Sequence, residues 1–476
     1  MHTLPRARFA KGFYPPNPKP YAIAILRAVR RLYLRFGQGT REVRFYNPGP
    51  IVDAYREFYA GKARLLILFR HVEVADGPMI MSALTGDLWR ITKSRRARRR
   101  HGVDGAPFPG KPHAYFLYGK DVLNWAGAAA RWAFPRLGGI PVVNTRLDRA
   151  SHDTIRNAIV RGDHPLALAP EGQVTYQMFH VSDLAAGVGT MARWIEEDLL
   201  SEPQRILVLP IALGYHLAEN HDALTRRVLA KVYQSLGEEA PRGVDLVEGL
   251  LEATRRLVDW LEAAYDRAYP AVEGESRGRA AEANTAAAAR TPLGRRIQLL
   301  CDRILRVSEL GTRVAGETTL QRLFTTRYRS TDLLYPEDAD PRSLPPLSRA
   351  WTDLRVLDAL TMDRHAQIVD VLMYVRPEYI AGDPGPHRLG EYALNLLDVV
   401  NRVSGGNIDS RYSPKGKRGR LLAGSPIDAG SLLRAPGRSP KEAISALNSR
   451  IRGELVTLSA ELEGRLTEEL RRPAAG

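Results

Sequence analysis

The sequence predicts an α/β protein: a mixed sheet flanked by helices, followed by a mostly helical C-terminal region. Two observations predict this class. Short apolar runs alternate with segments of helical period between residues 60 and 215, and strands that alternate with helices are typical of α/β layers. After about residue 220 the helical segments continue, and the sequence shows no further clear strand pattern.

The apolar runs are short enough to be buried strands. We predict strands at residues 64–69, 138–143, 165–169 and 205–213. Helices are predicted between them at residues 76–89, 121–134, 151–161 and 183–199. The C-terminal helices are predicted at 243–268, 294–323, 350–377, 387–403 and 440–470. Residues 271–292 are interpreted as a linker or an exposed helix, and residues 405–440 as a loop.

Length and composition suggest more than one domain. A chain of 476 residues is long enough for two or three domains. We predict an extended segment and an amphipathic helix in residues 1–50, a sheet-containing domain in residues 51–225 and a helical region in residues 226–476. Hydrophobic residues make up 44% of the chain and charged residues 26%, which is sufficient for a buried core.

The charge balance points to an anionic partner. The formal net charge is +16 and the pI is about 9.9, which suits nucleic acid, an anionic membrane surface or phosphorylated substrates. The single cysteine, Cys301, excludes an internal disulfide and a cysteine metal cluster. It lies in a helical run, so we predict a buried hydrophobic role for it.

Residues 21–36 are predicted to form a basic amphipathic helix. Its apolar residues and its arginines each recur with helical period, and they fall on different faces. The apolar set is Ile25, Val29, Leu32, Tyr33 and Phe36, and the basic set is Arg27, Arg30, Arg31 and Arg35. Such a helix can lie in the headgroup region of an anionic bilayer. Alternatively its apolar face packs on the protein core.

Neither a signal peptide nor a transmembrane helix is predicted. No uninterrupted apolar run of about 18 residues occurs in the sequence, and no apolar segment near the start ends in a small-residue cleavage site. We therefore expect a cytoplasmic protein that associates with a membrane, if at all, at its inner surface.

The first candidate for chemistry is the segment His71-Val-Glu-Val-Ala-Asp76, which follows the first predicted strand. Imidazole titrates near neutral pH and can take a proton from a hydroxyl. A carboxylate on its other ring nitrogen would fix the tautomer and stabilise the imidazolium. Asp76 could instead serve only as a helix N-cap.

Three further motifs follow in order. The segment Gly138-Gly139-Ile-Pro-Val-Val-Asn-Thr-Arg146 delivers an arginine at a strand exit, which suits phosphate recognition. The segment Ala169-Pro170-Glu171-Gly172-Gln173 predicts a tight turn that exposes amides and one carboxylate. In Val208-Leu-Pro210-Ile-Ala a proline interrupts an apolar strand, which favours an edge strand or a bulge.

Together these four motifs resemble the glycerolipid acyltransferase family, which includes the lysophosphatidate and glycerol-3-phosphate acyltransferases. The resemblance covers roughly residues 60–215, with the His-x4-Asp pair intact. Arg70 stands where the family commonly has Asn or Ser, and Gln173 where Thr is common. The second motif has extra residues before its arginine, so Arg146 is the expected equivalent and Arg149 the alternative.

The resemblance implies a mechanism. His71, paired with Asp76, would deprotonate the hydroxyl of glycerol phosphate or a lysophospholipid, which then attacks the thioester of acyl-CoA or acyl carrier protein. The implied substrate-binding residues are Gly139, Arg146, Arg149, Pro170, Glu171 and Gly172. Neither a metal nor another cofactor is implied. An acyltransferase core would then occupy the sheet-containing domain, and an anionic membrane surface would be its partner.

Two other functions stay open. A dense basic cluster spans residues 90–101 and could contact lipid headgroups, the phosphates of CoA or an acidic carrier protein. Such a run would also serve a nucleic-acid-binding protein, although no nucleic-acid motif accompanies it, so we expect no nucleic-acid partner. The remaining alternative is a catalytically degenerate acyltransferase-like scaffold.

Overall fold

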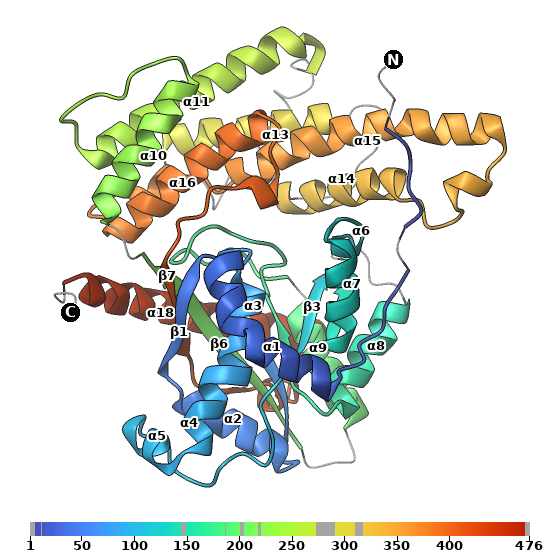
Figure 1. Cartoon of the computed structure of the whole chain (residues 1–476), viewed down its shortest axis with the longest axis vertical. Coiled ribbons are helices and arrows are strands. Elements are labelled where there is room, and N and C mark those ends of the chain that lie inside the picture. The colour runs from blue at the N-terminus through green and yellow to red at the C-terminus, as the bar shows by residue number, and fades with distance from the viewer. Residues whose placement is uncertain are drawn as a thin grey trace. The chain divides into compact units, whose positions relative to one another are not determined.

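The structure is a computed structural model, and it describes residues 5–10, 12–143, 149–185, 187–199, 204–217, 220–272, 291–309 and 318–471 (Figure 1). The chain divides into two compact units. The sheet unit comprises residues 13–122, 126–218 and 414–476, and the helical unit comprises residues 1–12, 123–125 and 219–413. The predicted class of a mixed sheet flanked by helices with a mostly helical C-terminal region is confirmed.

The sheet unit is built on one mixed sheet whose strand order is β1-β7-β6-β2-β5-β3-β4, with β8 also pairing β6. The pairs β1/β7, β2/β5, β2/β6, β3/β4 and β3/β5 are parallel, and β7 and β8 run antiparallel to β6. The strands are β1 (Thr40–Asn47), β2 (Ala63–Phe69), β3 (Tyr115–Gly119), β4 (Gly139–Val142), β5 (Leu166–Leu168), β6 (Arg205–His216), β7 (Lys417–Ala423) and β8 (Ile427–Asp428).

Strand β2 is apolar from Leu65 to Phe69 because both faces of the sheet are covered there. Its side chains alternate between two cores, with Leu65 and Ile67 in one and Leu66 in the other. Helices α2 (Gly49–Tyr59) and α3 (Asp76–Ser82) contribute to the first core. Helices α8 (Arg149–Arg161) and α9 (Gly187–Asp198) contribute to the second.

The other helices of the sheet unit surround this framework. α1 runs into the π-helical turn η1, and α3 continues through a second π-helical turn, η2, into α4. The boundary between the units falls within α6. The remaining bounds are α1 (Pro20–Leu32), η1 (Tyr33–Gly37), η2 (Ala83–Leu88), α4 (Trp89–Lys93), α5 (Arg95–Arg100), α6 (Val122–Trp125), α7 (Gly127–Arg136), α17 (Ala429–Leu433) and α18 (Pro440–Arg471).

Strand β7 corrects the prediction that residues 405–440 form a loop and that no strand follows residue 220. Lys417 and Arg420 are buried, although their charges suggested a solvated segment. Arg420 pairs with Glu42 and Glu469, so both charge and backbone are satisfied inside the sheet. The sequence pattern failed here because a basic strand carries no apolar alternation.

The predicted domain boundaries also differ from the two units, because elements outside the predicted sheet-containing domain belong to the sheet unit. Strand β1 falls in the segment predicted to precede the domain, and β7 and α18 fall in the region predicted to be separate from it. Each pairs with or packs on the sheet. Strand β3 was also missed, whereas the four predicted strands and the final helix are present.

Pro210 lies in the interior strand β6, so the expectation of an edge strand is wrong. On one side β6 pairs with β2 through Leu68 and Pro210. On the other side its partner changes, since β8 pairs up to Val208 and β7 pairs from Ile211. A residue without an N–H fits this change of partner, and the Pro210 carbonyl still accepts a hydrogen bond from the amide of Gly424 at 2.9 Å.

The helical unit consists of six longer helices and four short 3-10 turns within its described part. Asp245 caps α11 by accepting from the amides of Val247 and Glu248, and Thr318 forms a capping box at α14. Cys301 is buried in α13, as predicted. The elements are α10 (His221–Ser235), α11 (Leu246–Ala268), η3 (Pro270–Val272), α13 (Pro292–Ser308), α14 (Thr319–Leu334), η4 (Pro341–Ser343), α15 (Pro346–Leu372), η5 (Pro377–Ile380), α16 (Pro386–Val403) and η6 (Ile408–Ser410).

Within the described ranges, no helix combines the length and the apolar character that crossing a bilayer requires. The predicted linker lies mostly outside the described residues, which resume at residue 291.

Helix α18 contributes side chains to both cores of the sheet unit. Its buried leucines are predicted to stabilise the unit. Leu462 is fully buried and packs in the core beside Gly214, where an added Cβ would lie 3.2 Å from the leucine. We expect Leu462→Ala to lower the free energy of unfolding by about 2–5 kcal/mol, because it removes buried surface and leaves a cavity. Urea unfolding measures this. Val456→Ala, on the exposed side of the same helix, should change the midpoint little, and equal effects would contradict the packing.

Candidate active site

The predicted dyad is formed in the structure. His71 lies two residues beyond the end of β2, and Asp76 is the first residue of α3. The Nδ1 atom of His71 is 3.0 Å from Oδ2 of Asp76. Since an ionised carboxylate only accepts, Nδ1–H donates, and Nε2 keeps its lone pair for a substrate proton. The side chain of His71 is 26% exposed and that of Asp76 is fully buried, so solvent reaches only the imidazole.

Asp76 is held by four donors. Its Oδ2 also accepts from the backbone amides of Val72 at 2.6 Å and Glu73 at 2.7 Å. Its Oδ1 accepts from the hydroxyl of Tyr215 at 2.5 Å. These bonds fix the carboxylate beside the imidazole and compensate its burial. The role of N-cap for Asp76 is not observed, since Ala75 occupies the cap position and no side chain caps the helix.

Tyr215 is the neutral support of this carboxylate. It lies on β6 and is buried. Burial, and after it the carboxylates of Asp76 and Glu73, raise the pKa of Tyr215 well above its ordinary value. The phenol therefore keeps its proton and donates a hydrogen bond to Asp76. The Nζ atom of Lys417 lies 4.8 Å from the centre of the Tyr215 ring and also pairs with Glu73, so strand β7 supports the dyad.

A buried ion pair joins the first motif to the third. The Nε atom of Arg70 donates to both carboxylate oxygens of Glu171, at 3.0 and 3.1 Å. Both side chains are fully buried. Oε2 of Glu171 also accepts from the backbone amide of His71 at 3.1 Å. Glu171 therefore fixes the backbone of the proposed base rather than facing a substrate.

Arg70 also organises the loop that follows the Pro-Glu-Gly turn. Its two terminal nitrogens donate to the carbonyls of Met178, Gln177 and His180 at 3.1, 3.1 and 2.6 Å. The amide of Thr175 donates to the carbonyl of His71 at 2.7 Å. Tyr176 between them has φ 54°, the only positive value outside glycine among the described residues. A side chain in this left-handed region is strained, and the surrounding bonds hold it there.

The Pro-Glu-Gly turn follows β5 as predicted, but the prediction that its carboxylate is exposed is wrong. Glu171 is 2% exposed because it pairs with Arg70. Gly172 has φ 76°, a conformation that glycine adopts without strain, and its amide closes the turn on Ala169 at 3.2 Å. Pro170 is buried, and its carbonyl accepts from the amide of Ala185 at 2.7 Å. Backbone hydrogen bonds therefore fix the turn that carries Glu171, whose carboxylate accepts from the amide of His71.

Within the second motif, the carboxyl end of β4 lies on the same edge of the sheet but further away. Strands β2, β5, β3 and β4 are parallel neighbours, so β4 is three strand spacings from β2, or about 14 Å. Gly139 begins β4 and is buried, where a Cβ would meet the carbonyl of Phe134 at 2.9 Å. Arg146 lies outside the described residues. Arg149 begins α8, and its 96% exposed side chain pairs with Asp153.

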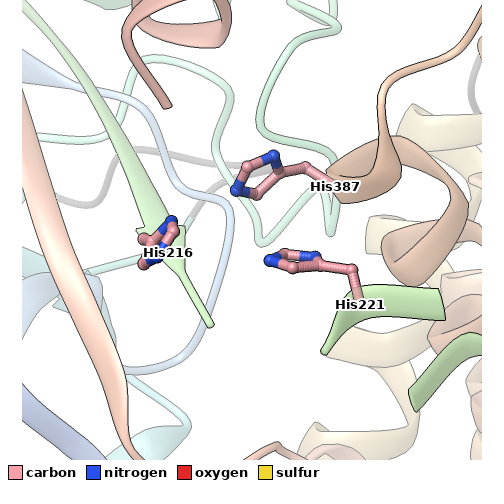
Figure 2. A group of neighbouring side chains, drawn as sticks. All are labelled: His216, His221 and His387. Atoms are coloured by element: carbon pink, nitrogen blue, oxygen red, sulfur yellow. The ribbon is translucent and has the colours of Figure 1, made fainter. Parts of the chain in front are cut away.

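The sequence predicted no metal site, and three buried histidines are the group of described residues that could be considered for one. Figure 2 draws His216, at the end of β6 in the sheet unit, with His221 and His387 of the helical unit. The rings of His221 and His387 are 4.4 Å apart between centroids and meet edge to face. Two histidines within one unit are fewer than the three protein ligands of a typical catalytic zinc site.

Comparison with known proteins found no match to this chain. No protein-family model, no curated protein and no solved structure matches this chain. The resemblance to the glycerolipid acyltransferases thus rests on the four sequence motifs, and its mechanism must be argued from the geometry of the site.

Three residues of the site were missed by the sequence analysis. Tyr215 continues the two-residue alternation of the apolar strand that starts at Leu207, so its inward position was predictable. The hydroxyl of Ser459 accepts from Arg70 at 2.9 Å. Lys417 and Ser459 lie 202 and 244 residues beyond residue 215, where the resemblance to the family ends. No local pattern points to them.

The buried pair predicts a large loss of stability on removal of Arg70. We expect Arg70→Met to lower the free energy of unfolding of the sheet unit by about 3–5 kcal/mol, because Glu171 would stay buried without its cation. Urea unfolding measures this. The matched control is Arg156→Met, which breaks the partly exposed pair with Asp198 and should cost less than about 1 kcal/mol. A similar small cost for both variants would contradict the role of Arg70.

Tyr215 is predicted to orient the dyad without touching the substrate. In Tyr215→Phe the Oδ1 atom of Asp76 loses the hydroxyl that donates to it, so the carboxylate becomes less well fixed. The kcat of a reaction that uses His71 as its base should fall by about tenfold, equivalent to about 1.4 kcal/mol, the order of one hydrogen bond. KM should change little. The control is Tyr233→Phe, whose buried hydroxyl has no hydrogen-bond partner in the described part of the chain. An unchanged kcat in Tyr215→Phe would exclude the positioning role.

Proposed function

We propose that the protein is an O-acyltransferase that moves a fatty acyl group from acyl-CoA or acyl carrier protein to a hydroxyl of glycerol phosphate or a lysophospholipid. The observation that carries the proposal is the hydrogen bond between Nδ1 of His71 and the buried carboxylate of Asp76. It leaves Nε2 as a base on a partly exposed imidazole, which is the group that hydroxyl activation requires.

The proposed step balances without a covalent enzyme intermediate. Nε2 of His71 takes the proton of the acceptor hydroxyl as the oxygen attacks the thioester carbonyl. The C–O bond forms, the C–S bond breaks, and the imidazolium returns its proton to the departing thiolate. Asp76 stabilises the imidazolium and keeps its orientation. Cys301 is buried in the helical unit, so it is not offered as a nucleophile.

The arrangement of the parallel strands supports the same proposal. Both the His71 segment and the Pro-Glu-Gly turn follow the carboxyl ends of neighbouring parallel strands, β2 and β5. That edge is where open α/β sheets bind their ligands. Arg146, or Arg149 in its place, would contact an acceptor phosphate, since both follow β4 in the sequence. We propose that the enzyme acts at the inner, cytoplasmic face of a membrane, where such acceptors are found.

His71→Ala is expected to abolish acyl transfer, and Asp76→Asn to lower kcat by about 10²–10⁴-fold, the range that general acid–base catalysis contributes. The measurement is transfer of a labelled acyl group from acyl-CoA and acyl carrier protein to a panel of glycerol phosphate and lysolipid acceptors. Circular dichroism checks that each variant is folded.

The control for this experiment is a second His–Asp contact on the surface of the same unit. Nδ1 of His152 lies 3.0 Å from Asp153, so His152→Ala removes a comparable pair outside the proposed site. It should keep the wild-type rate. If wild-type protein transferred the acyl group to none of the acceptors, or if His71→Ala were as active as wild type, the proposed function would be wrong.

A further inference from the structure

Helix α1 turns its apolar side toward solvent. Six large side chains along α1 and η1 are between 44% and 76% exposed, and they follow the spacing i, i+4, i+8, i+11, i+12 and i+15 that forms one helical stripe. This apolar stripe consists of Tyr21, Ile25, Val29, Leu32, Tyr33 and Phe36. The alternative in which this face packs on the protein core is therefore wrong.

The opposite side of α1 attaches the helix to the sheet unit. Ala22 of α1 and Leu34 of η1 are buried. Nε of Arg27 donates to the carbonyl of Thr85 in η2 at 2.8 Å, and its guanidinium lies 5.9 Å from the ring centre of Trp89. The Arg30 side chain lies against Gly86. Two arginines thus face the protein while the larger apolar residues face outward, which is the reverse of an ordinary surface helix.

The surroundings of the apolar stripe are positively charged. Arg31 and Arg35 are exposed, and at 100° per residue they fall on one flank of the stripe. Arg90 on α4 is 63% exposed and pairs with Asp87. Burial, and after it the charges of Arg31, Arg27 and Arg90, lower the pKa of Arg30, which agrees with a local excess of positive charge.

We propose that the apolar stripe of α1 and η1 is a docking surface for the interface of an anionic phospholipid bilayer. The apolar side chains would enter the acyl boundary, and the flanking arginines would meet phosphate groups. Tyr21 and Tyr33 suit such a boundary because each has an apolar ring and a polar end. A nucleic acid would match the arginines but leave the six apolar side chains in water, so the lipid surface is the better fit.

Docking at this face has a consequence for the proposed active site. Helix α1 contacts η2, which continues directly from α3, and α3 begins at Asp76. Val74, in the loop between His71 and Asp76, is another exposed apolar side chain, at 45%. A lipid acceptor in the bilayer would therefore lie next to the unit that carries His71 and Asp76. Only this consequence rests on the proposed function, whereas the docking surface itself does not.

The test is sedimentation of the full chain with two kinds of vesicle, phosphatidylcholine alone and phosphatidylcholine mixed with phosphatidylglycerol. Wild-type protein should bind the anionic vesicles, with an affinity that falls as salt is added. The variant Ile25→Ser/Leu32→Ser/Phe36→Ser should bind about tenfold or more weakly, since it removes the apolar stripe. The variant Arg31→Gln/Arg35→Gln should lose about fivefold for each arginine on anionic vesicles.

Matched controls come from the exposed side of α18. Val456→Ser removes an apolar side chain that is 43% exposed, and Arg450→Gln removes a charge that is 64% exposed. Both should bind like wild type. His71→Ala should also bind like wild type, so that loss of catalysis and loss of docking are distinguishable.

Three results would overturn the proposal. The first is failure of the wild-type protein to sediment with anionic vesicles, and the second is sedimentation of the serine variant to the same extent as wild type. The third result is a wild-type dimer in solution that the serine variant abolishes while vesicle binding is absent, since a second copy of the chain would then cover the stripe.

Discussion

The geometry of the candidate site depends on the buried contact between Arg70 and Glu171. Removing two charges from water costs several kcal/mol for each ion, so such a pair persists only when its remaining polar atoms find partners. Here each nitrogen of the guanidinium contacts acceptors, and both oxygens of Glu171 accept from backbone amides as well, those of Ser182 and His71. One side chain thereby joins the end of β2, the turn after β5 and the loop behind it.

This arrangement explains why the C-terminal segment belongs to the sheet unit. The hydroxyl of Ser459 on α18 is one of the acceptors for Arg70, and Lys417 on β7 lies over the Tyr215 ring that supports Asp76. The backbone of His71 and the carboxylate of Asp76 are thus each connected to residues beyond position 414. The residues up to position 215 include the dyad and its direct hydrogen-bond partners, and Ser459 and Lys417 in turn contact two of the supporting residues, Arg70 and Tyr215.

The sequence predicted the parts of the fold that local pattern determines. The apolar runs around Leu66 and Val208 became central strands, and His71 and Asp76 met across their loop. The sequence did not predict β7, because Lys417 and Arg420 are stabilised by Glu73, Glu42 and Glu469, which lie far away along the chain. Glu171 was predicted to be exposed for the same reason, since nothing in its own turn indicates that Arg70 lies beneath it.

Ion pairs also determine which side chains carry the net charge of +16. Buried cations such as Arg70, Arg402 and Arg420 are paired with carboxylates, so each pair cancels and contributes little to the field outside. The excess must therefore be carried by other side chains, and α5, with five arginines and no acid in its six residues, carries part of it. Composition alone left nucleic acid and membrane equally open. The position of Arg31 and Arg35 beside an exposed apolar stripe favours the membrane, because only a lipid interface satisfies charge and apolar surface together.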